Sequence, residues 1–237
     1  MRSWRGVRSL LLFAVVVFAP AAAPCQQADR GETPAEPVAR QPVEKQKRVL
    51  GIIPNNRTYP SLVHYEPISA KEKFKIATGD SFDRGTVVLA AAFAGEGQLT
   101  RSNPSFGQGV AGYARYFGTA YADLVIGDYM TEGVFPTLLH EDPRYFRRGT
   151  GRAWSRVLYA MGQIFWGYRD SGRRGFNFSE IGGNAAAVAI SNAYYPDNRD
   201  PASAAAKLGT QVGVDMAGNI LKEFWPDIVG KLGRKKK

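Results

Sequence analysis

The sequence predicts an all-α protein: a compact bundle of five or six helices that follows an extended N-terminal segment. Three observations predict this fold. In several segments apolar residues recur every three or four positions, which is the period of a helix buried on one side. Helix-capping residues stand before these segments, and Gly or Pro separates them. No run alternates apolar and polar residues for long enough to predict a sheet.

The N-terminal quarter of the chain lies outside the predicted bundle. Residues 1–25 combine arginines, a short apolar run and small residues, the pattern of a secretory signal peptide. Cys25 is either removed with this segment or lipidated, and the preceding proline disfavours lipidation. Residues 26–48 are polar and Pro-rich, which predicts a disordered linker. We therefore expect export to the periplasm or the outer-membrane periphery, with a helical domain over residues 49–230 and a basic tail over residues 231–237.

Local signals place the first two helices. Residues 49–67 contain several prolines and predict an extended segment. Ser69 and Glu72 have the spacing of a capping box, which begins a short helix that reaches about residue 78. Residues 85–99 are compatible with a strand or a helix, and their alanines favour the helix.

The next predicted helix is the longest. Residues 109–139 contain no helix breaker before Pro136, and aromatic residues recur along one face. Pro136 should kink or end this helix. Pro143 should prevent its continuation much past His140.

Three further signals place the C-terminal helices. Residues 153–168 predict a helix from their apolar spacing. Asn177 and Glu180 are spaced as a capping box before a segment rich in small residues. Asp200 followed by proline predicts the start of the last helix, and Pro226 predicts its end.

Positive charge is concentrated in the second half of the domain. The chain has a formal net charge of +10, and eight arginines against three acidic residues lie within residues 141–174. Such a cluster attracts phosphate-rich surfaces, which in an exported protein means anionic lipid or other envelope phosphates rather than nucleic acid. The arginines expected to bind such a surface are Arg144, Arg147, Arg148, Arg152, Arg156, Arg173 and Arg174.

His140 and Asp142 are the candidate catalytic residues. In a hydrolase of envelope lipids or esters, His140 would be the general base and Asp142 would orient it, with His64 or Ser171 completing the pocket. In the alternative interpretation, which we favour, His140 only ends a helix, where a partly cationic imidazole suits the helix dipole. Tyr145 would then pack on the bundle.

The same alternative has Phe146 packed beside Tyr145, and Arg144, Arg147 and Arg148 facing water. Only two histidines occur in the chain, and no zinc or nucleotide-binding motif is present, so we expect no metal and no cofactor.

Small residues on two segments allow helices to approach closely. Gly182, Gly183 and their alanine neighbours, together with Gly209 and Gly213, would suit either tight packing in a bundle, a homo-oligomer, or a membrane-embedded bundle. Asp128, Asn184, Asn192 and Asp215 lie among apolar neighbours. We expect internal partners for them, with an arginine such as Arg115 or Arg156 as the donor; the alternative is that they line a polar pocket.

Three stretches of the chain carry a resemblance: HEDPRYFRRG, FNFSEIGGNAAAVAISNAYYP and KEFWPDI. Together they resemble a group of exported bacterial helical proteins of unknown function, over about residues 49–228. The resemblance implies that the bundle is a unit in its own right, and it brings no activity with it.

The sequence therefore favours a secreted, membrane-associated module of the cell envelope that is not catalytic and has a basic surface peripheral to the membrane. A hydrolase that uses His140 and Asp142, and a membrane-embedded helical bundle, are the alternatives.

Overall fold

A computed structural model describes residues 48–49, 53–54, 58–59 and 65–234, which belong to one compact unit. The predicted signal peptide, the predicted linker up to residue 47, His64 and the last three residues lie outside the described residues.

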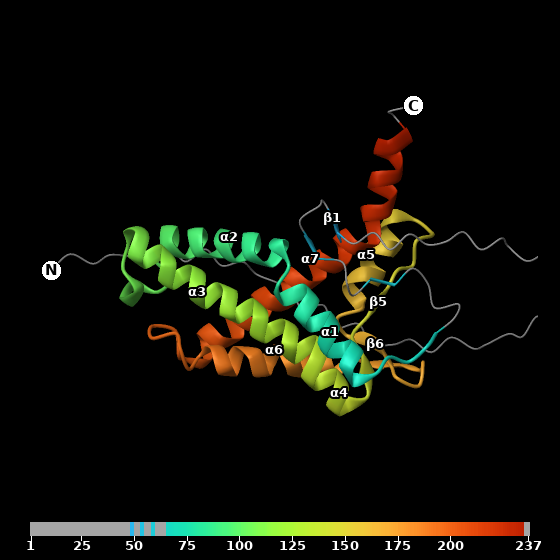
Figure 1. Cartoon of the computed structure of the whole chain (residues 1–237), viewed down its shortest axis with the longest axis horizontal. Coiled ribbons are helices and arrows are strands. Elements are labelled where there is room, and N and C mark those ends of the chain that lie inside the picture. Colours follow the sequence, from blue (N-terminus) through green and yellow to red (C-terminus); the bar gives the residue numbers. More distant parts are fainter. Residues whose placement is uncertain (1–47, 50–52, 55–57, 60–64, 235–237) are drawn as a thin grey trace, which may run out of the picture. The chain divides into compact units, whose positions relative to one another are not determined.

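The fold is all-α, as predicted (Figure 1). The helices are α1 (Ala70–Ser81), α2 (Arg84–Thr100), α3 (Gly109–Asp128), α4 (Phe135–Leu139), α5 (Ala153–Gly162), α6 (Phe178–Ser191) and α7 (Pro201–Arg234), with a 3-10 helix at Pro104–Phe106 and a π-helix at Tyr129–Val134.

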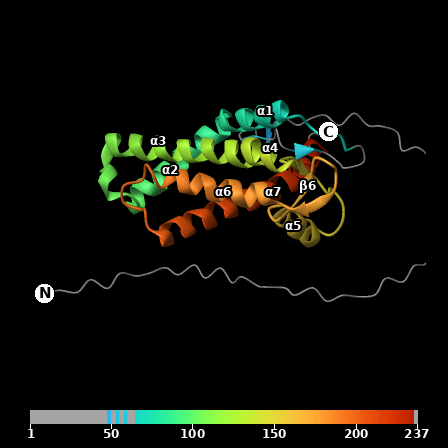
Figure 2. The same cartoon turned by 90° about the horizontal axis from the view of Figure 1, so that it is seen from below.

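The helices pack both on neighbours in the chain and on helices that are distant in the sequence. Helices α2 and α3 form a long hairpin, and α6 packs on both α3 and α7 (Figures 1 and 2). Helix α1 packs on the π-helix that follows α3, and α5 packs on α7. Both the α3–α6 and the α5–α7 contacts bring together segments that are distant in the sequence, and they place the loop after α4 beside the C-terminal half of the chain.

The predicted caps are present. Ser69 and Glu72 form the complete capping box of α1: the Ser69 hydroxyl accepts from the Glu72 N–H at 3.3 Å, and Glu72 accepts from the Ser69 N–H at 2.8 Å. The Asn177 side chain accepts from the N–H of Glu180 at 3.1 Å at the start of α6. Asp200 accepts from two backbone N–H groups of the first turn of α7, both at 3.0 Å.

The long predicted helix is divided in three. Helix α3 runs to Asp128, the π-helix follows, and α4 carries Pro136 at its second residue. The extra residue in each turn of a π-helix distorts the regular hydrogen-bond pattern of the helix, so this distortion of the long helix lies before Pro136. Helix α4 ends at His140, which adopts a left-handed conformation with φ 53°.

The prediction of one helix over residues 153–168 is wrong in its second half. Helix α5 stops at Gly162, and residues of its expected continuation form β6 (Trp166–Arg169), which pairs antiparallel with β7 (Arg174–Phe176) and with β4 (Glu141–Asp142). Gly172, with φ 76°, permits the turn between β6 and β7. Two smaller pairings complete the strands: β1 (Arg48–Val49) with β2 (Ile53–Pro54), and β3 (Thr58–Tyr59) with β5 (Tyr145–Phe146).

The prediction that Pro226 ends the last helix is also wrong, because α7 continues to Arg234 with Pro226 inside it. Proline removes one hydrogen bond of the ladder and bends a helix without having to end it. Helix α7 turns away from the other helices toward its C-terminal end (Figure 1). Among the helices that the structure describes, none combines the length and the apolar character needed to cross a membrane.

Candidate functional site

His140 and Asp142 lie close in sequence but have different surroundings. The side chain of His140 is 85% exposed, and its Nδ1 lies 3.9 Å from a carboxylate oxygen of Asp170. Asp142 is buried and accepts hydrogen bonds from Arg144 and from the hydroxyl of Tyr65 at 2.9 Å. The carboxylate beside His140 is therefore that of Asp170, whereas Asp142 forms an internal ion pair with Arg144.

Asp142 and Arg144 form a two-pronged ion pair. Arg144 Nε donates to Oδ1 at 2.9 Å and Nη2 donates to Oδ2 at 2.6 Å. The guanidinium also lies against the rings of Tyr65 and Phe146, at 5.5 and 5.2 Å from their centroids. Burial, and then the charge of Asp142, raise the pKa of Tyr65 well above its usual value. Arg144 is thus buried, contrary to the expectation that it faces water, whereas Tyr145 and Phe146 are buried as expected.

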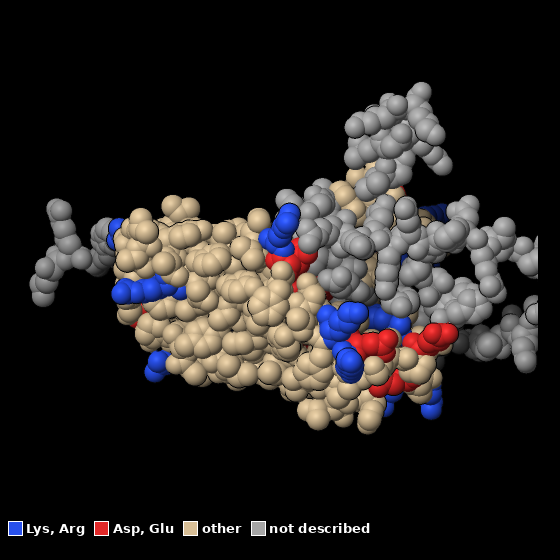
Figure 3. Space-filling model, viewed as in Figure 1, with Lys and Arg blue, Asp and Glu red and all other residues tan. Residues whose placement is uncertain are grey.

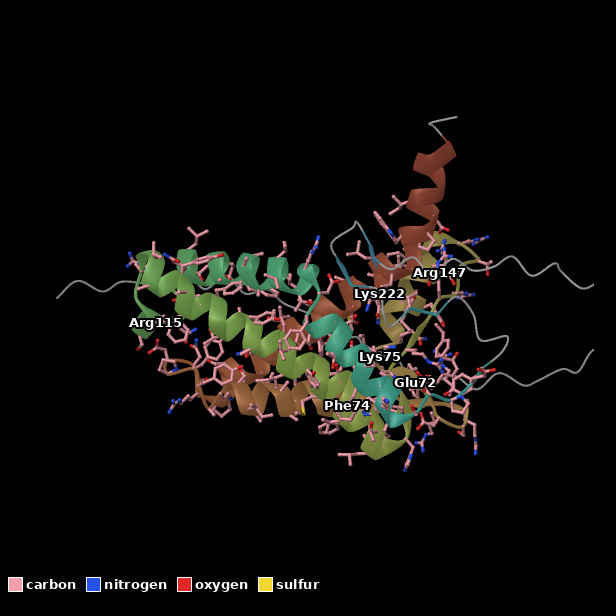
Figure 4. The ribbon with its side chains drawn as sticks, in the orientation of Figure 1. Glu72, Phe74, Lys75, Arg115, Arg147 and Lys222 are labelled. Carbon is pink, nitrogen blue, oxygen red and sulfur yellow. The ribbon has the colours of Figure 1, made fainter. Side chains whose placement is uncertain are left out.

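A second internal cluster is built around Glu223 of α7, which is 0% exposed. Its carboxylate accepts from Arg156 Nε at 2.8 Å and from the hydroxyl of Tyr145 at 2.8 Å. Asp227, one turn later, accepts from both Arg156 and Arg147 at 2.6 Å. Figure 4 labels Arg147 beside α7. The carboxylates of α7 therefore hold two of the arginines that the sequence assigned to an anionic surface.

The remaining arginines of that set are exposed: Arg148, Arg152, Arg173 and Arg174. Arg148 and Arg152 lie just before α5, and Arg173 and Arg174 lie at the β6–β7 hairpin. The sequence alone does not separate the exposed arginines from the internally paired ones among these seven. Only the positions of Asp142, Glu223 and Asp227 in the fold separate the internally paired from the exposed ones.

An open groove of about 590 Å³ lies along the start of α5. We name it the arginine–tryptophan groove, and its lining residues are Arg148, Arg152, Trp154, Ser155, Leu158 and Tyr159. Trp154 is 70% exposed and Leu158, one turn later on the same side of α5, is 53% exposed. Arg148 Nη1 donates to the Ser155 hydroxyl at 2.9 Å, which holds its guanidinium at the edge of the groove.

The β6–β7 hairpin and the first residue of α6 carry a row of exposed aromatic rings. The centroids of Trp166 and Phe176 are 5.9 Å apart, and those of Phe176 and Phe178 are 4.9 Å apart. Arg173 and Arg174 lie at the turn end of the same hairpin. Sequence reasoning missed this surface because it assigned residues 163–168 to a helix. The signal that could have found it is the Asp-Ser-Gly turn between two short runs of aromatic residue and arginine.

Polar residues that the sequence placed among apolar neighbours find partners inside the bundle. Asn184 Nδ2 donates to Asp215 at 3.1 Å, which joins α6 to α7. The Ser81 hydroxyl donates to Asp128 at 3.1 Å. Internal partners were expected for these residues, and the partners include the amide of Asn184 and the hydroxyl of Ser81.

Within the described residues, no group of three or more His, Cys, Asp or Glu side chains is arranged to hold a metal ion. No protein-family model, no curated protein and no solved structure matches this chain.

Proposed function

We propose that this chain is an exported, non-catalytic module of the cell envelope that binds an anionic membrane surface through the arginine–tryptophan groove. The observation that carries the proposal is the exposed pair Trp154 and Leu158 on one side of α5, bordered by the exposed Arg148 and Arg152. The pattern of a signal peptide in residues 1–25 supports the location.

The composition of the groove suits the boundary between lipid headgroups and acyl chains. Tryptophan concentrates at this boundary because its ring is apolar and its indole N–H is polar. Each arginine near an anionic leaflet contributes about 1 kcal/mol at physiological salt, and the contribution falls off within a Debye length. Arg148 and Arg152 together would then favour anionic over neutral vesicles by about thirtyfold. The hairpin arginines, Arg173 and Arg174, would add to this preference.

The test is flotation of the purified full-length chain with neutral and with anionic vesicles. The quantity measured is the ratio of bound protein on anionic to neutral vesicles at physiological salt. Replacing Arg148 and Arg152 together by Gln should lower this ratio by about thirtyfold. The matched control replaces Lys71 and Lys75, which are exposed on α1, by Gln and changes the net charge equally. An equal fall in the control, or no fall in the groove variant, would overturn the proposal.

A further inference from the structure

The interior of this bundle is unusually polar. Among the described residues, nineteen buried side chains are polar or charged, against twelve that are hydrophobic, and half of those twelve are alanine. Eighteen large hydrophobic side chains are exposed. Proteins in water bury large apolar side chains and rarely bury charges. The distribution here departs from this rule in the direction expected when part of the surroundings of the helices is itself apolar.

Helix α7 shows the same tendency, because its polar side chains face other elements of the bundle. Its polar side chains at every fourth position face other elements: Lys207, Gln211, Asp215, Asn219 and Glu223. Lys207 pairs with Asp123 at 2.8 Å, Asp215 accepts from Asn184, and the Asn219 amide donates to a carbonyl oxygen of α5 at 3.4 Å. The apolar row one position further along, from Leu208 to Phe224, is only half-buried. Within the polar row, Asn219 and Glu223 are buried, whereas its other three members are half-buried like the apolar row. The most deeply buried side chains of α7 are therefore polar.

The two most exposed large hydrophobic side chains of the described residues lie on the α2–α3 hairpin. Val88, Leu99 and Val110 are 54%, 87% and 90% exposed. We name this surface the α2–α3 outer face; it also includes Val87, Leu89 and Tyr113. Over α2 and α3 the surface is largely without charge, and Lys and Arg gather toward the ends of the hairpin (Figure 3). One carboxylate, that of Glu96, stands one turn before the end of α2.

We propose that the α2–α3 outer face contacts the acyl chains of a phospholipid bilayer. Exposed arginines border the apolar stretch at both ends: Arg84 at the start of α2, and Arg101 and Arg115 at the other end, where Figure 4 labels Arg115. Their charge is complementary to the phosphates that border the acyl layer of a bilayer.

A bilayer suits the distribution of apolar side chains better than a second copy of the chain does. Each of the helices α1 to α7 carries at least one exposed large hydrophobic side chain. A single protein partner covers one side of a molecule, whereas acyl chains form a continuous apolar medium. The inference is independent of the arginine–tryptophan groove, because it concerns a different part of the surface and a force that salt does not screen.

The first test reads the environment of the outer face directly. In a background with Cys25 replaced by Ser, a single cysteine at Val88 or Val110 is labelled with an environment-sensitive fluorophore, and Lys71 is labelled in the same way as the control. The full-length chain is mixed with neutral phosphatidylcholine vesicles at about 1 M salt, where the Debye length is about 3 Å and charge attraction is screened. Nitroxides on the acyl chains should quench the label at Val88 and Val110 several-fold more than aqueous iodide does, and the reverse should hold at Lys71.

The second test uses Val88→Lys with Val110→Lys. Both side chains are exposed, so the variant should fold in water with an unchanged circular dichroism spectrum, yet it should lose flotation with neutral vesicles at high salt. The Arg148→Gln, Arg152→Gln variant should keep that flotation and lose only its preference for anionic lipid, so the two proposals fail separately. Equal iodide quenching at Val88 with and without vesicles would overturn the inference. A stable dimer that hides Val88 without any acyl-chain quenching would overturn it in favour of a second copy.

Discussion

The buried carboxylate of Glu223 offers the sharpest test of how α7 is held. Glu223 uses both oxygens twice: one accepts from Arg156 and the Gly149 N–H, and the other accepts from the Tyr145 hydroxyl and the Arg148 N–H, all at 2.8 to 3.0 Å. Glu223→Ala removes both acceptor oxygens, and with them all four hydrogen bonds. It leaves two backbone donors, one hydroxyl and part of one guanidinium in a place that water does not reach.

The expected loss of stability follows from these contacts. Removing one partner of a buried ion pair typically costs about 3–5 kcal/mol. Arg156 would keep Asp227 as a counter-charge, but the Tyr145 hydroxyl and two backbone N–H groups would lose their acceptor. For a chain of this size a loss of about 3–5 kcal/mol corresponds to a fall of about 6–20 °C in the melting temperature. Glu223→Gln retains one carbonyl oxygen but points an amide donor at two other donors, so we expect it to cost less than alanine and more than 1 kcal/mol, which is about the net value of one hydrogen bond.

The pH dependence gives a second measurement. Burial alone would raise the pKa of Glu223, but the hydrogen bonds from Arg156, Gly149, Tyr145 and Arg148 outweigh it and hold the pKa below its usual value of 4.5. A carboxyl with a lowered pKa in the folded state adds stability above its unfolded pKa and loses it as the pH falls through the folded value. Stability should therefore fall below about pH 4.5, and less steeply in Glu223→Gln.

The assay is urea unfolding followed by far-UV circular dichroism, between pH 7 and acid pH, for the wild type and both Glu223 variants. Glu96→Gln is the matched control: Glu96 is exposed, and its replacement should change the free energy of unfolding by less than about 0.5 kcal/mol. If Glu223→Ala behaves like this control, the carboxylate does not hold α7 against α5, and the reasoning is refuted.

Two further substitutions test close packing and backbone strain by the same assay. Gly183→Val should destabilise by about 1–3 kcal/mol, because a Cβ at Gly183 would lie 3.0 Å from backbone atoms of Met130 and Thr131, whereas Gly209→Ala, where a Cβ meets nothing within 4 Å, should stabilise by about 0.5–1 kcal/mol. His140→Gly should leave stability unchanged or raise it by up to about 1 kcal/mol, because His140 adopts a left-handed conformation that glycine accepts without strain; a clear loss would mean that the imidazole makes a stabilising interaction.

Features that depend on neighbouring residues were predictable. The caps at Ser69, Asn177 and Asp200 each satisfy N–H groups two or three residues away, so the signal and its partner lie in the same short stretch of sequence. The end of α4 close to His140, shortly before Pro143, follows from the same local reasoning, whereas the left-handed conformation of His140 was not predicted.

Features that depend on distant partners were not. Residues 163–168 have apolar spacing that suits a helix, yet β6 forms because β7 and β4 offer strand partners on either side. Pro226 stays within α7 although proline usually ends helices. Its neighbour Asp227 is held by Arg147 and Arg156, about seventy to eighty residues away in the chain.

The sequence by itself determined that this is a helical protein with a basic second half, because helical period, caps and net charge are all local or additive properties. The tertiary structure alone decided which arginines are exposed and which are buried in ion pairs, since that depends on where α7 places Glu223 and Asp227. It also decided which side of each helix faces inward. The polar row of α7 faces inward because it finds hydrogen-bond and ion-pair partners on α3, α5 and α6. The sequence of α7 alone does not indicate where these partners lie.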